Sequence, residues 1–296
     1  MPVQENPVQA WRDIKLQYKK LHYPQPRDPH LPRMFFVSLA VGSRGSGKSY
    51  SIVGLLKQYE KCGIVDPESG ELTAQRIILF SPTIAGNPIF TALQHLSEDD
   101  IVSNYSDERL LEKIQDVEQE RKETEKYQRL LKAYRKFLKT KSVDALDHDD
   151  LLELAKNDFE PPEPPKYPNG CCIFMVFDDL VGTDAFKSTG RSALTNLVLK
   201  NRHLRINIFI ATQNLKAIPK SIRTNTSLFV IFKFASKKII LEDLYQEVSN
   251  TLTLEQFEEL YEYATQEEHD CLVMDFTASK EERFKKNFKS VIRVSH

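Results

Sequence analysis

The fold is decided by residues 34–49, MFFVSLAVGSRGSGKS. The first eight are almost all apolar and predict a buried β-strand. The next eight match the pattern G-x-x-x-x-G-K-[ST], in which a glycine-rich turn joins a strand to a helix. Residues 49–60 follow with apolar side chains at 52, 53, 55 and 56, a spacing that suits an amphipathic helix. This order of strand, loop and helix is the context that the motif requires, and it leaves little room for a chance match on a glycine-rich turn.

The loop between this strand and this helix has the composition of a nucleotide phosphate site. Its glycines let the backbone approach phosphate oxygens, and the helix N-terminus adds positive potential. Lys48 is placed to reach the β- and γ-phosphates, and the Ser49 hydroxyl is placed to bind Mg²⁺. The residues expected to contact the nucleotide are Gly42, Ser43, Arg44, Gly45, Ser46, Gly47, Lys48, Ser49 and Tyr50.

A second predicted strand, residues 173–177, ends in two carboxylates, Asp178 and Asp179. A nucleotide site of this kind needs an acid at the carboxyl end of a buried strand, where it holds the Mg²⁺ shell. We therefore expect Asp178 to bind the metal and Asp179 to polarise the attacking water. The alternative is a strand that runs into a turn carrying two solvated acids.

A third predicted strand, residues 206–211, is followed by Thr212-Gln213-Asn214. Ligands of open α/β sheets bind at the carboxyl ends of the strands, so Gln213 is a candidate to sense the γ-phosphate or to position the water. A polar strand end is also common for ordinary reasons of turn formation. Hydrolysis also needs a cation that stabilises the transition state. Four arginines are candidates, and the sequence alone does not distinguish them: Arg44, Arg202, Arg205 and Arg223.

Further β-rich apolar runs occur at residues 76–80 and 228–232, and the segments between the predicted strands are long enough for crossover helices. The expected fold is an α/β domain over residues 34–296, with a mostly parallel central sheet flanked by helices. Residues 1–33 carry six of the 15 prolines and little periodicity. We expect them to form an N-terminal arm along the surface, with one helical turn near residues 11–20, that contacts an adaptor or another subunit.

A helical insertion is predicted at about residues 100–160. Residues 89–160 contain neither Gly nor Pro, and apolar residues recur at spacings of three and four through residues 107–139. One helix over that range would be about 50 Å long, but Arg121 and Thr124 interrupt its apolar stripe, so a projecting helix and a hairpin both fit. The segment 161–168, PPEPPKYP, is expected to return the chain to the sheet as a stiff spacer. The alternative is an insertion that merely covers the sheet.

The composition is that of a globular protein. The chain has 296 residues, 41% apolar and 28% charged, with 41 Lys+Arg against 42 Asp+Glu. A net charge of −1 argues against a histone-like protein that binds nucleic acid by bulk charge. The longest apolar run, residues 171–177, is too short to span a membrane, and residues 1–20 lack the apolar segment of a signal peptide. The four cysteines show no C-x-x-C spacing, which favours reduced thiols and a cytosol-like compartment.

The near-neutral total conceals two oppositely charged segments. Residues 185–241 contain 11 Lys/Arg and no Asp/Glu, and residues 242–279 contain 11 Asp/Glu and no Lys/Arg. We expect the two segments to occupy opposite faces, with a helix that opens at a capping box from Thr253 to Gln256. In a ring, the basic face would line a channel and contact DNA phosphates, with Lys216, Lys220 and Arg223 as candidates. Alternatively, the two faces neutralise each other within one subunit.

The ordered series VSLAVGSRGSGKS, IILFSPT, IFMVFDDL, LKNRHLRINIFIATQN and IPKSIRTN, within residues 34–235, resembles the genome-packaging ATPases of large DNA viruses and virophages, the poxvirus-type branch of the FtsK–HerA class. The resemblance implies an additional-strand P-loop NTPase fold that uses ATP and Mg²⁺ to move double-stranded DNA into a preformed capsid. It also implies a homo-oligomeric ring, pentamer or hexamer, that docks on a capsid or portal-vertex protein, and a location in the virion and in the virus factory of the host cytoplasm.

The resemblance further implies roles for single residues. Lys48 and Ser49 match the nucleotide ligands, and Asp178 matches the metal ligand. The remaining matches are Asp179 as the catalytic acid, Gln213 as the sensor and Arg202 as the arginine that acts on a neighbouring subunit's site.

Three positions depart from the family's pattern. Asp179 stands where related motors often have Glu, and Asn201 stands where Gly is expected. Arg44 resembles the loop arginine of terminase-type motors, which contacts the γ-phosphate and competes with Arg202 for that role. Two alternatives stay open: another FtsK–HerA-type DNA translocase or helicase, and a nucleotide-binding switch or scaffold with little turnover.

Overall fold

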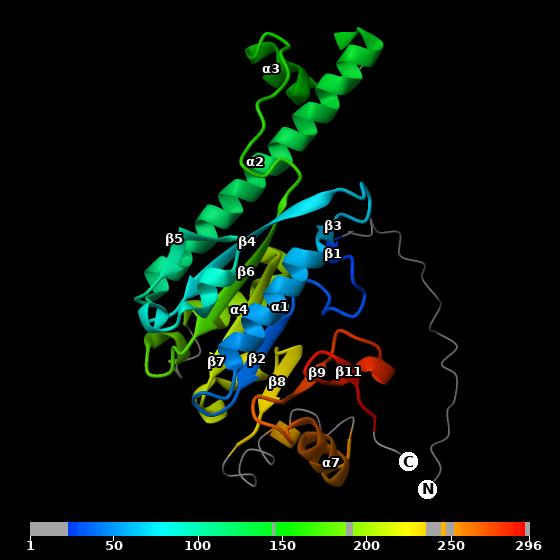
Figure 1. Ribbon diagram of the computed structural model, residues 1–296. Coiled ribbons are helices and arrows are strands. Elements are labelled where there is room, and N and C mark those ends of the chain that lie inside the picture. The colour runs from blue at the N-terminus through cyan, green and yellow to red at the C-terminus, as the bar shows by residue number, and fades with distance from the viewer. Residues whose placement is uncertain (1–22, 144–145, 188–191, 235–243, 247–251, 294–296) are drawn as a thin grey trace, which may run out of the picture.

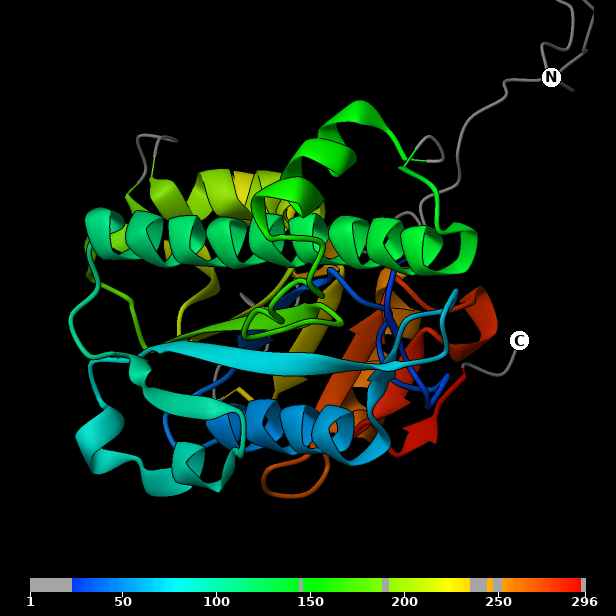
Figure 2. The same cartoon turned by 90° about the horizontal axis from the view of Figure 1, so that it is seen from above.

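The computed structural model describes residues 23–143, 146–187, 192–234, 244–246 and 252–293. A central sheet carries helices on both faces (Figures 1 and 2). Five parallel strands form its core, in the order β4-β6-β7-β2-β8. They are β2 (Val37–Val41), β4 (Leu72–Phe80), β6 (Cys171–Asp178), β7 (Ile206–Thr212) and β8 (Leu228–Phe232). Strand β7 lies between the strand that precedes the phosphate loop and the strand that carries Asp178, which confirms the expected additional-strand P-loop fold.

Shorter strands extend the sheet at both edges. Beyond β4 lie the parallel β5 (Leu96–Val102) and the antiparallel β3 (Ile64–Val65) and β1 (Gln25–Pro26). Beyond β8 lie the antiparallel strands β9 (Cys271–Asp275), β10 (Phe284–Lys286) and β11 (Ser290–Val291). Short 3-10 turns connect several elements: η1 (Ile84–Gly86), η2 (Pro88–Ala92), η4 (Asp184–Phe186), η5 (Leu215–Ala217) and η6 (Lys280–Glu282).

Both faces of the core strands are apolar, as expected for parallel strands buried between two helical layers. On β4, Ile78 and Phe80 belong to one hydrophobic core, whereas Ile77 and Leu79 belong to the other. Helix α1 (Lys48–Cys62) covers the second face with Ile52, Val53, Leu55, Leu56 and Tyr59. The first face is covered by α2 (Asp107–Thr140), α4 (Ala193–Leu204), α5 (Lys220–Arg223) and α7 (Leu254–Ala264).

The helices of the basic and acidic segments cover the same side of the sheet. Leu197 of α4, Ile222 of α5 and Phe257 of α7 all pack into the same core on the same side of the sheet. Charge counts do not determine which face of a sheet a helix covers, because the apolar side of each helix decides that. The helix predicted at the capping box is confirmed as α7, in which Thr253 and Gln256 cap each other's backbone groups.

The insertion is a single helix that projects from the body, followed by a short returning helix. The first half of α2 packs on the sheet through Leu110 and Val117, and its second half extends beyond the sheet (Figure 1). Helix α3 (His148–Lys156) lies against this second half, and Glu153 pairs with Lys126 at 2.8 Å. Thr124, which interrupts the apolar stripe, is buried and donates to the carbonyl oxygen of Tyr167 at 2.8 Å. The polar interruption therefore marks the point where the Pro-rich segment attaches to the helix.

Residues 23–33 lie along the body, and Gln25–Pro26 pair with β3. The Tyr59 hydroxyl donates to the Pro32 carbonyl at 2.6 Å, and Lys285 Nζ donates to the His30 carbonyl at 2.9 Å. The helical turn predicted near residues 11–20 lies outside the described residues. All four cysteines are free thiols. Within the described part of the chain, every helix is too short or too polar to cross a membrane.

Candidate nucleotide site

The phosphate loop is held in a shape that requires glycine at two positions. A Cβ atom on Gly42 would lie 2.5 Å from Ser46 Oγ and 2.7 Å from Phe232 Cβ, so the loop closes only without a side chain there. Gly47 has φ +102°, a left-handed conformation that other residues adopt at a cost. The Gly42 N–H donates to the Thr212 carbonyl at 3.2 Å, which ties the loop to the end of β7.

Helix α1 begins directly after this loop, with Gly47 as its N-cap and no side chain that caps its first turn. The first N–H groups of an α-helix have no acceptor within the helix, and the helix dipole adds positive potential there. An uncapped N-terminus that follows a glycine-rich loop is a ready binding site for a phosphate group.

Lys48 is held against the loop. Its ammonium group donates to the Gly42 carbonyl at 2.9 Å and to the Ser43 carbonyl at 2.8 Å. Burial lowers the pKa of Lys48, while the charges of Asp178 and Asp179 act in the opposite direction. A partly desolvated cation at this position interacts more strongly with a phosphate than it would in water.

Ser49 and Asp178 face each other across the gap between α1 and β6. Ser49 Oγ lies 3.2 Å from both carboxylate oxygens of Asp178, whose side chain is buried. Burial and the charge of Asp179 raise the pKa of Asp178, while the Ser49 hydrogen bond and Lys48 lower it.

This hydroxyl and carboxylate fit Mg²⁺, which prefers oxygen ligands and is often held by one or two protein groups together with nucleotide phosphates. The described residues contain no group of three His, Cys, Asp or Glu side chains that would hold a metal without a nucleotide.

Asp179 and Gln213 meet at the ends of β6 and β7. Gln213 Nε2 donates to Asp179 Oδ1 at 3.2 Å, and both side chains border the same pocket as Lys48 and Ser49. Asp179 has φ +55°, in the left-handed region, so the backbone turns sharply after the buried Asp178. The predicted metal acid, catalytic acid and sensor therefore lie together at the carboxyl edge of the sheet.

The pocket also includes residues beyond the predicted set. Of the residues expected to contact the nucleotide, Arg44 and Tyr50 also line it, and Tyr50 is 72% exposed. Thr83 and Asn87, which follow β4, were not predicted. They lie at this edge of the sheet because β4 pairs with β6. The sequence signal that could have identified them is the run of short polar residues directly after an apolar strand. On the other side of the loop, His269 Cβ lies 3.5 Å from where a Cβ of Gly47 would be, at a position for which the sequence holds no comparable signal.

The remaining predicted cations are placed differently. Arg202 and Arg205 precede β7, whereas Gln213 follows it, and a seven-residue strand separates the two ends by about 20 Å. Arg202 is therefore far from its own subunit's site, and any contact with a nucleotide requires a neighbouring subunit. Lys216 and Lys220 are exposed and Arg223 is half-buried, on the segment of η5 and α5 that follows the sensor strand.

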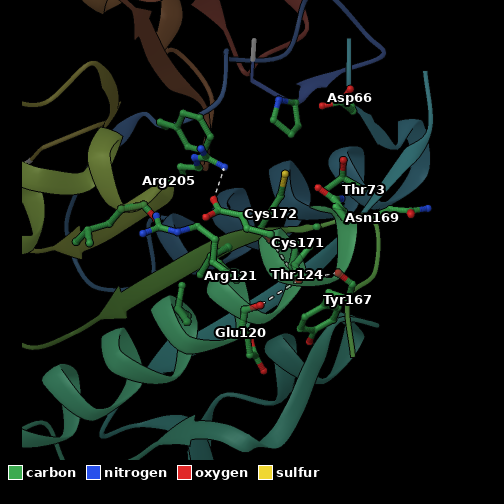
Figure 3. Close-up of a pocket in the computed structure, with 18 residues that line it drawn as sticks. Asp66, Thr73, Glu120, Arg121, Thr124, Tyr167, Asn169, Cys171, Cys172 and Arg205 are labelled. Carbon is green, nitrogen blue, oxygen red and sulfur yellow. Dashed lines mark hydrogen bonds and ion pairs between the residues drawn. The ribbon is translucent and has the colours of Figure 1, made fainter. Parts of the chain in front are cut away.

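A second cavity, of about 150 Å³, lies near the amino ends of β6 and β7 (Figure 3). Glu120, Arg121 and Thr124 reach it from α2, and Tyr167 and Arg205 face them. Arg121 Nη1 donates to the His203 carbonyl at 3.2 Å, and Arg205 pairs with Glu125 at 3.7 Å. These contacts attach α2 to the end of α4, so the cavity belongs to the base of the projecting helix.

Comparison with known proteins gives distant similarities of fold. The chain matches no protein-family profile, and no curated protein sequence matches it. Among solved structures it is similar to the DNA-packaging ATPase from Sulfolobus turreted icosahedral virus, at 13% identity over 86% of this chain and 97% of that chain, with a TM-score of 0.45. It is also similar to the genome packaging NTPase from Sulfolobus turreted icosahedral virus 2 in complex with sulfate, at 12% identity over 85% and 95% of the chains, again with a TM-score of 0.45.

A third similar structure is the N-terminal domain of zonular occludens toxin from Neisseria meningitidis, at 16% identity over 70% and 80% of the chains, with a TM-score of 0.32. The assignment of this chain to the additional-strand P-loop fold rests on its own strand order and phosphate loop.

Proposed function

We propose that this chain is an ATP-hydrolysing motor that moves double-stranded DNA into a viral capsid. The observation that carries the proposal is the meeting of Lys48, the Ser49–Asp178 pair and the Asp179–Gln213 pair at one edge of the sheet. Hydrolysis of a nucleoside triphosphate needs a phosphate cradle, a metal ligand and a group that orients water, and these three groups of residues are the candidates for those roles.

The position of each residue in the site suggests its role. The α1 N-terminus and Lys48 would bind the phosphates, and Ser49 with Asp178 would hold Mg²⁺, which neutralises charge on the phosphate oxygens when bound. Asp179 is placed to accept a proton from the attacking water, and Gln213 orients the Asp179 carboxylate through their hydrogen bond. Arg44 is the one arginine among the described residues that line this pocket, so it is a candidate to contact the phosphates, while Arg202 would act on a neighbour's site.

The transported substrate is proposed to be duplex DNA. The basic segment that contains Lys216, Lys220 and Arg223 follows the sensor strand, so movement of Gln213 would be transmitted directly to it. Such contacts bind phosphates without regard to base sequence and add up around a ring. The resemblance to packaging ATPases extends the proposal to a pentameric or hexameric ring on a capsid or portal-vertex protein, in the virion and the host cytoplasm.

The test is ATP hydrolysis by the purified full chain, with and without duplex DNA. We expect DNA to stimulate hydrolysis and Asp179→Asn to lower the rate about 10²–10⁴-fold, the usual effect of removing a general base. Lys48→Ala should abolish hydrolysis, whereas Lys61→Ala, at the exposed far end of the same helix, should not. Unchanged activity in Asp179→Asn, together with no stimulation by DNA, would leave a nucleotide-dependent switch or scaffold as the function.

A forked DNA substrate distinguishes packaging from strand separation. Strand displacement by the wild-type protein would indicate a helicase of the same structural class, whereas movement along intact duplex without displacement supports packaging. The Lys216→Glu and Lys220→Glu changes should weaken DNA binding at fixed salt and spare hydrolysis in the absence of DNA.

A further inference from the structure

The projecting half of α2 carries an unbalanced positive charge. Residues 126–141 contain seven Lys/Arg and no Asp/Glu. Lys126 and Arg129 pair with acids of α3 at 2.8 and 3.0 Å. The next four basic residues are exposed and form no ion pair with any residue that the structure describes: Lys132, Arg135, Lys136 and Lys139.

These four residues form one stripe. Their spacing of three, one and three residues places them on the same face of the helix, over about 10 Å of its length. Like charges at these spacings repel each other, so the stripe destabilises the isolated helix slightly. An apolar border runs beside it, formed by half-buried Leu131 and Tyr134 and by Leu138, which is 54% exposed. A basic stripe with an apolar border suits a protein partner with an acidic, partly apolar surface.

Helix α7 presents the complementary pattern. Its acids stand at positions with the same spacing of three, one and three residues: Glu255, Glu258, Glu259 and Glu262. Two exposed apolar side chains lie on either side of this acidic stripe, Leu254 at 39% and Tyr263 at 53%. The spacing of three, one and three residues is the same from either end of a helix. The basic and acidic side chains can therefore face each other whether the two helices run parallel or antiparallel.

The two helices lie at opposite ends of the molecule, with the end of α2 at the top of Figure 1 and α7 at the bottom. They cannot meet within one subunit. We propose that the projecting half of α2 of one copy docks on α7 of the next copy, with the basic stripe facing the acidic stripe. This contact uses different surfaces on the two copies, so it joins subunits head to tail and generates either a closed ring or a filament.

The matching patterns favour a second copy over nucleic acid as the occupant. A DNA backbone would neutralise the four cations, but it would leave Tyr134 and Leu138 exposed beside it. The contact between α2 and α7 needs no bound nucleotide. Loss of assembly and loss of the proposed ATPase activity can therefore be measured independently.

The test is charge reversal on each helix, alone and combined, in the full-length protein. Sedimentation velocity at about 50 mM salt, below physiological screening, measures the dissociation constant between subunits. We expect Lys132→Glu with Lys136→Glu, and separately Glu258→Lys with Glu259→Lys, to raise that constant about tenfold or more. The four changes together should restore it to within about threefold of the wild-type value. The matched control, Lys61→Glu with Lys122→Glu, changes the net charge equally at exposed positions outside the stripe and should leave assembly unchanged.

Circular dichroism should show that all variants are folded, because Lys132, Lys136 and Glu259 are exposed and Glu258 is half-buried. The proposal is overturned if folded single-helix variants assemble like the wild type, or if the combined variant stays as dissociated as either alone. Loss of duplex DNA binding by the α2 variant with unchanged assembly would also overturn it, in favour of DNA as the occupant.

Discussion

Replacement of Arg76 by Met should lower the free energy of unfolding, because Arg76 connects the base of α2 to the sheet. Arg76 on β4 donates to both carboxylate oxygens of Asp100 on β5, at 2.7 and 2.8 Å, and to Glu120 on α2 at 2.7 Å. The side chains of Arg76 and Asp100 are only 7% and 4% exposed. Removal of one member of a buried pair leaves the other charge uncompensated and costs about 3–5 kcal/mol. Lys113, at 3.2 Å from Asp100, compensates part of the charge, so we expect a loss of about 3 kcal/mol.

Urea unfolding followed by circular dichroism measures this loss as a change in the free energy of unfolding. The control is Lys187→Met, which removes an exposed pair with Asp184 and should change stability by less than about 0.5 kcal/mol. In Arg76→Met combined with Asp100→Leu no carboxylate is left unpaired, so the double variant should be more stable than Arg76→Met alone. A loss below about 1 kcal/mol in the single variant, or an equal loss in the double variant, would refute the reasoning.

Three further predictions concern single features of the structure. Burial raises the pKa of Asp100, but bonds from Arg76 and Lys113 bring it below the ordinary 3.8. The pair therefore stabilises the fold above pH 3.8, and this stabilisation is lost as pH falls through the lower folded pKa. The difference in the free energy of unfolding between wild type and Arg76→Met should shrink on acidification below that value, and a difference that does not shrink would contradict this. Gly42→Ala should lower the free energy of unfolding by about 1–3 kcal/mol and weaken nucleotide binding more than about tenfold by calorimetry, because the new Cβ would lie only 2.7 Å from the Cβ of the buried Phe232. Thr124→Val should cost about 0.5–1.5 kcal/mol, because the Tyr167 carbonyl loses one of its two donors and keeps the Gly170 N–H, whereas the exposed Thr140→Val should be nearly neutral in the same unfolding assay.

The sequence predicted the core of the site well because its signals are local. A glycine pattern between an apolar strand and a helix identifies the phosphate loop, and acids or amides that directly follow apolar runs identify Asp178, Asp179 and Gln213. Parallel strands bring their carboxyl ends to one edge, so these separate signals combine into one site without further information.

The remaining features depend on contacts between distant residues. Strand β5 reads LSEDDIV, which carries no β-strand signal, and it forms at the sheet edge where the buried Asp100 meets Arg76. Thr124 was visible only as an interruption of an apolar stripe, because its partner is the Tyr167 carbonyl. The side of the sheet that α7 covers could not be predicted, because charge counts carry no information about which side of the sheet a connection crosses.

The position of β2 in the middle of the sheet has a consequence for synthesis on the ribosome. Its two neighbours, β7 and β8, lie about 170 and 190 residues further along the chain. At about 5–20 residues per second, both edges of β2 therefore stay unpaired for roughly 10–40 seconds after it is made. During this time the strand exposes hydrogen-bonding edges and apolar side chains, which favours chaperone binding or aggregation. A nascent chain that ends at residue 178 already contains Lys48 and Asp178, yet it lacks β7, which lies between β2 and β6, and so cannot assemble the phosphate site.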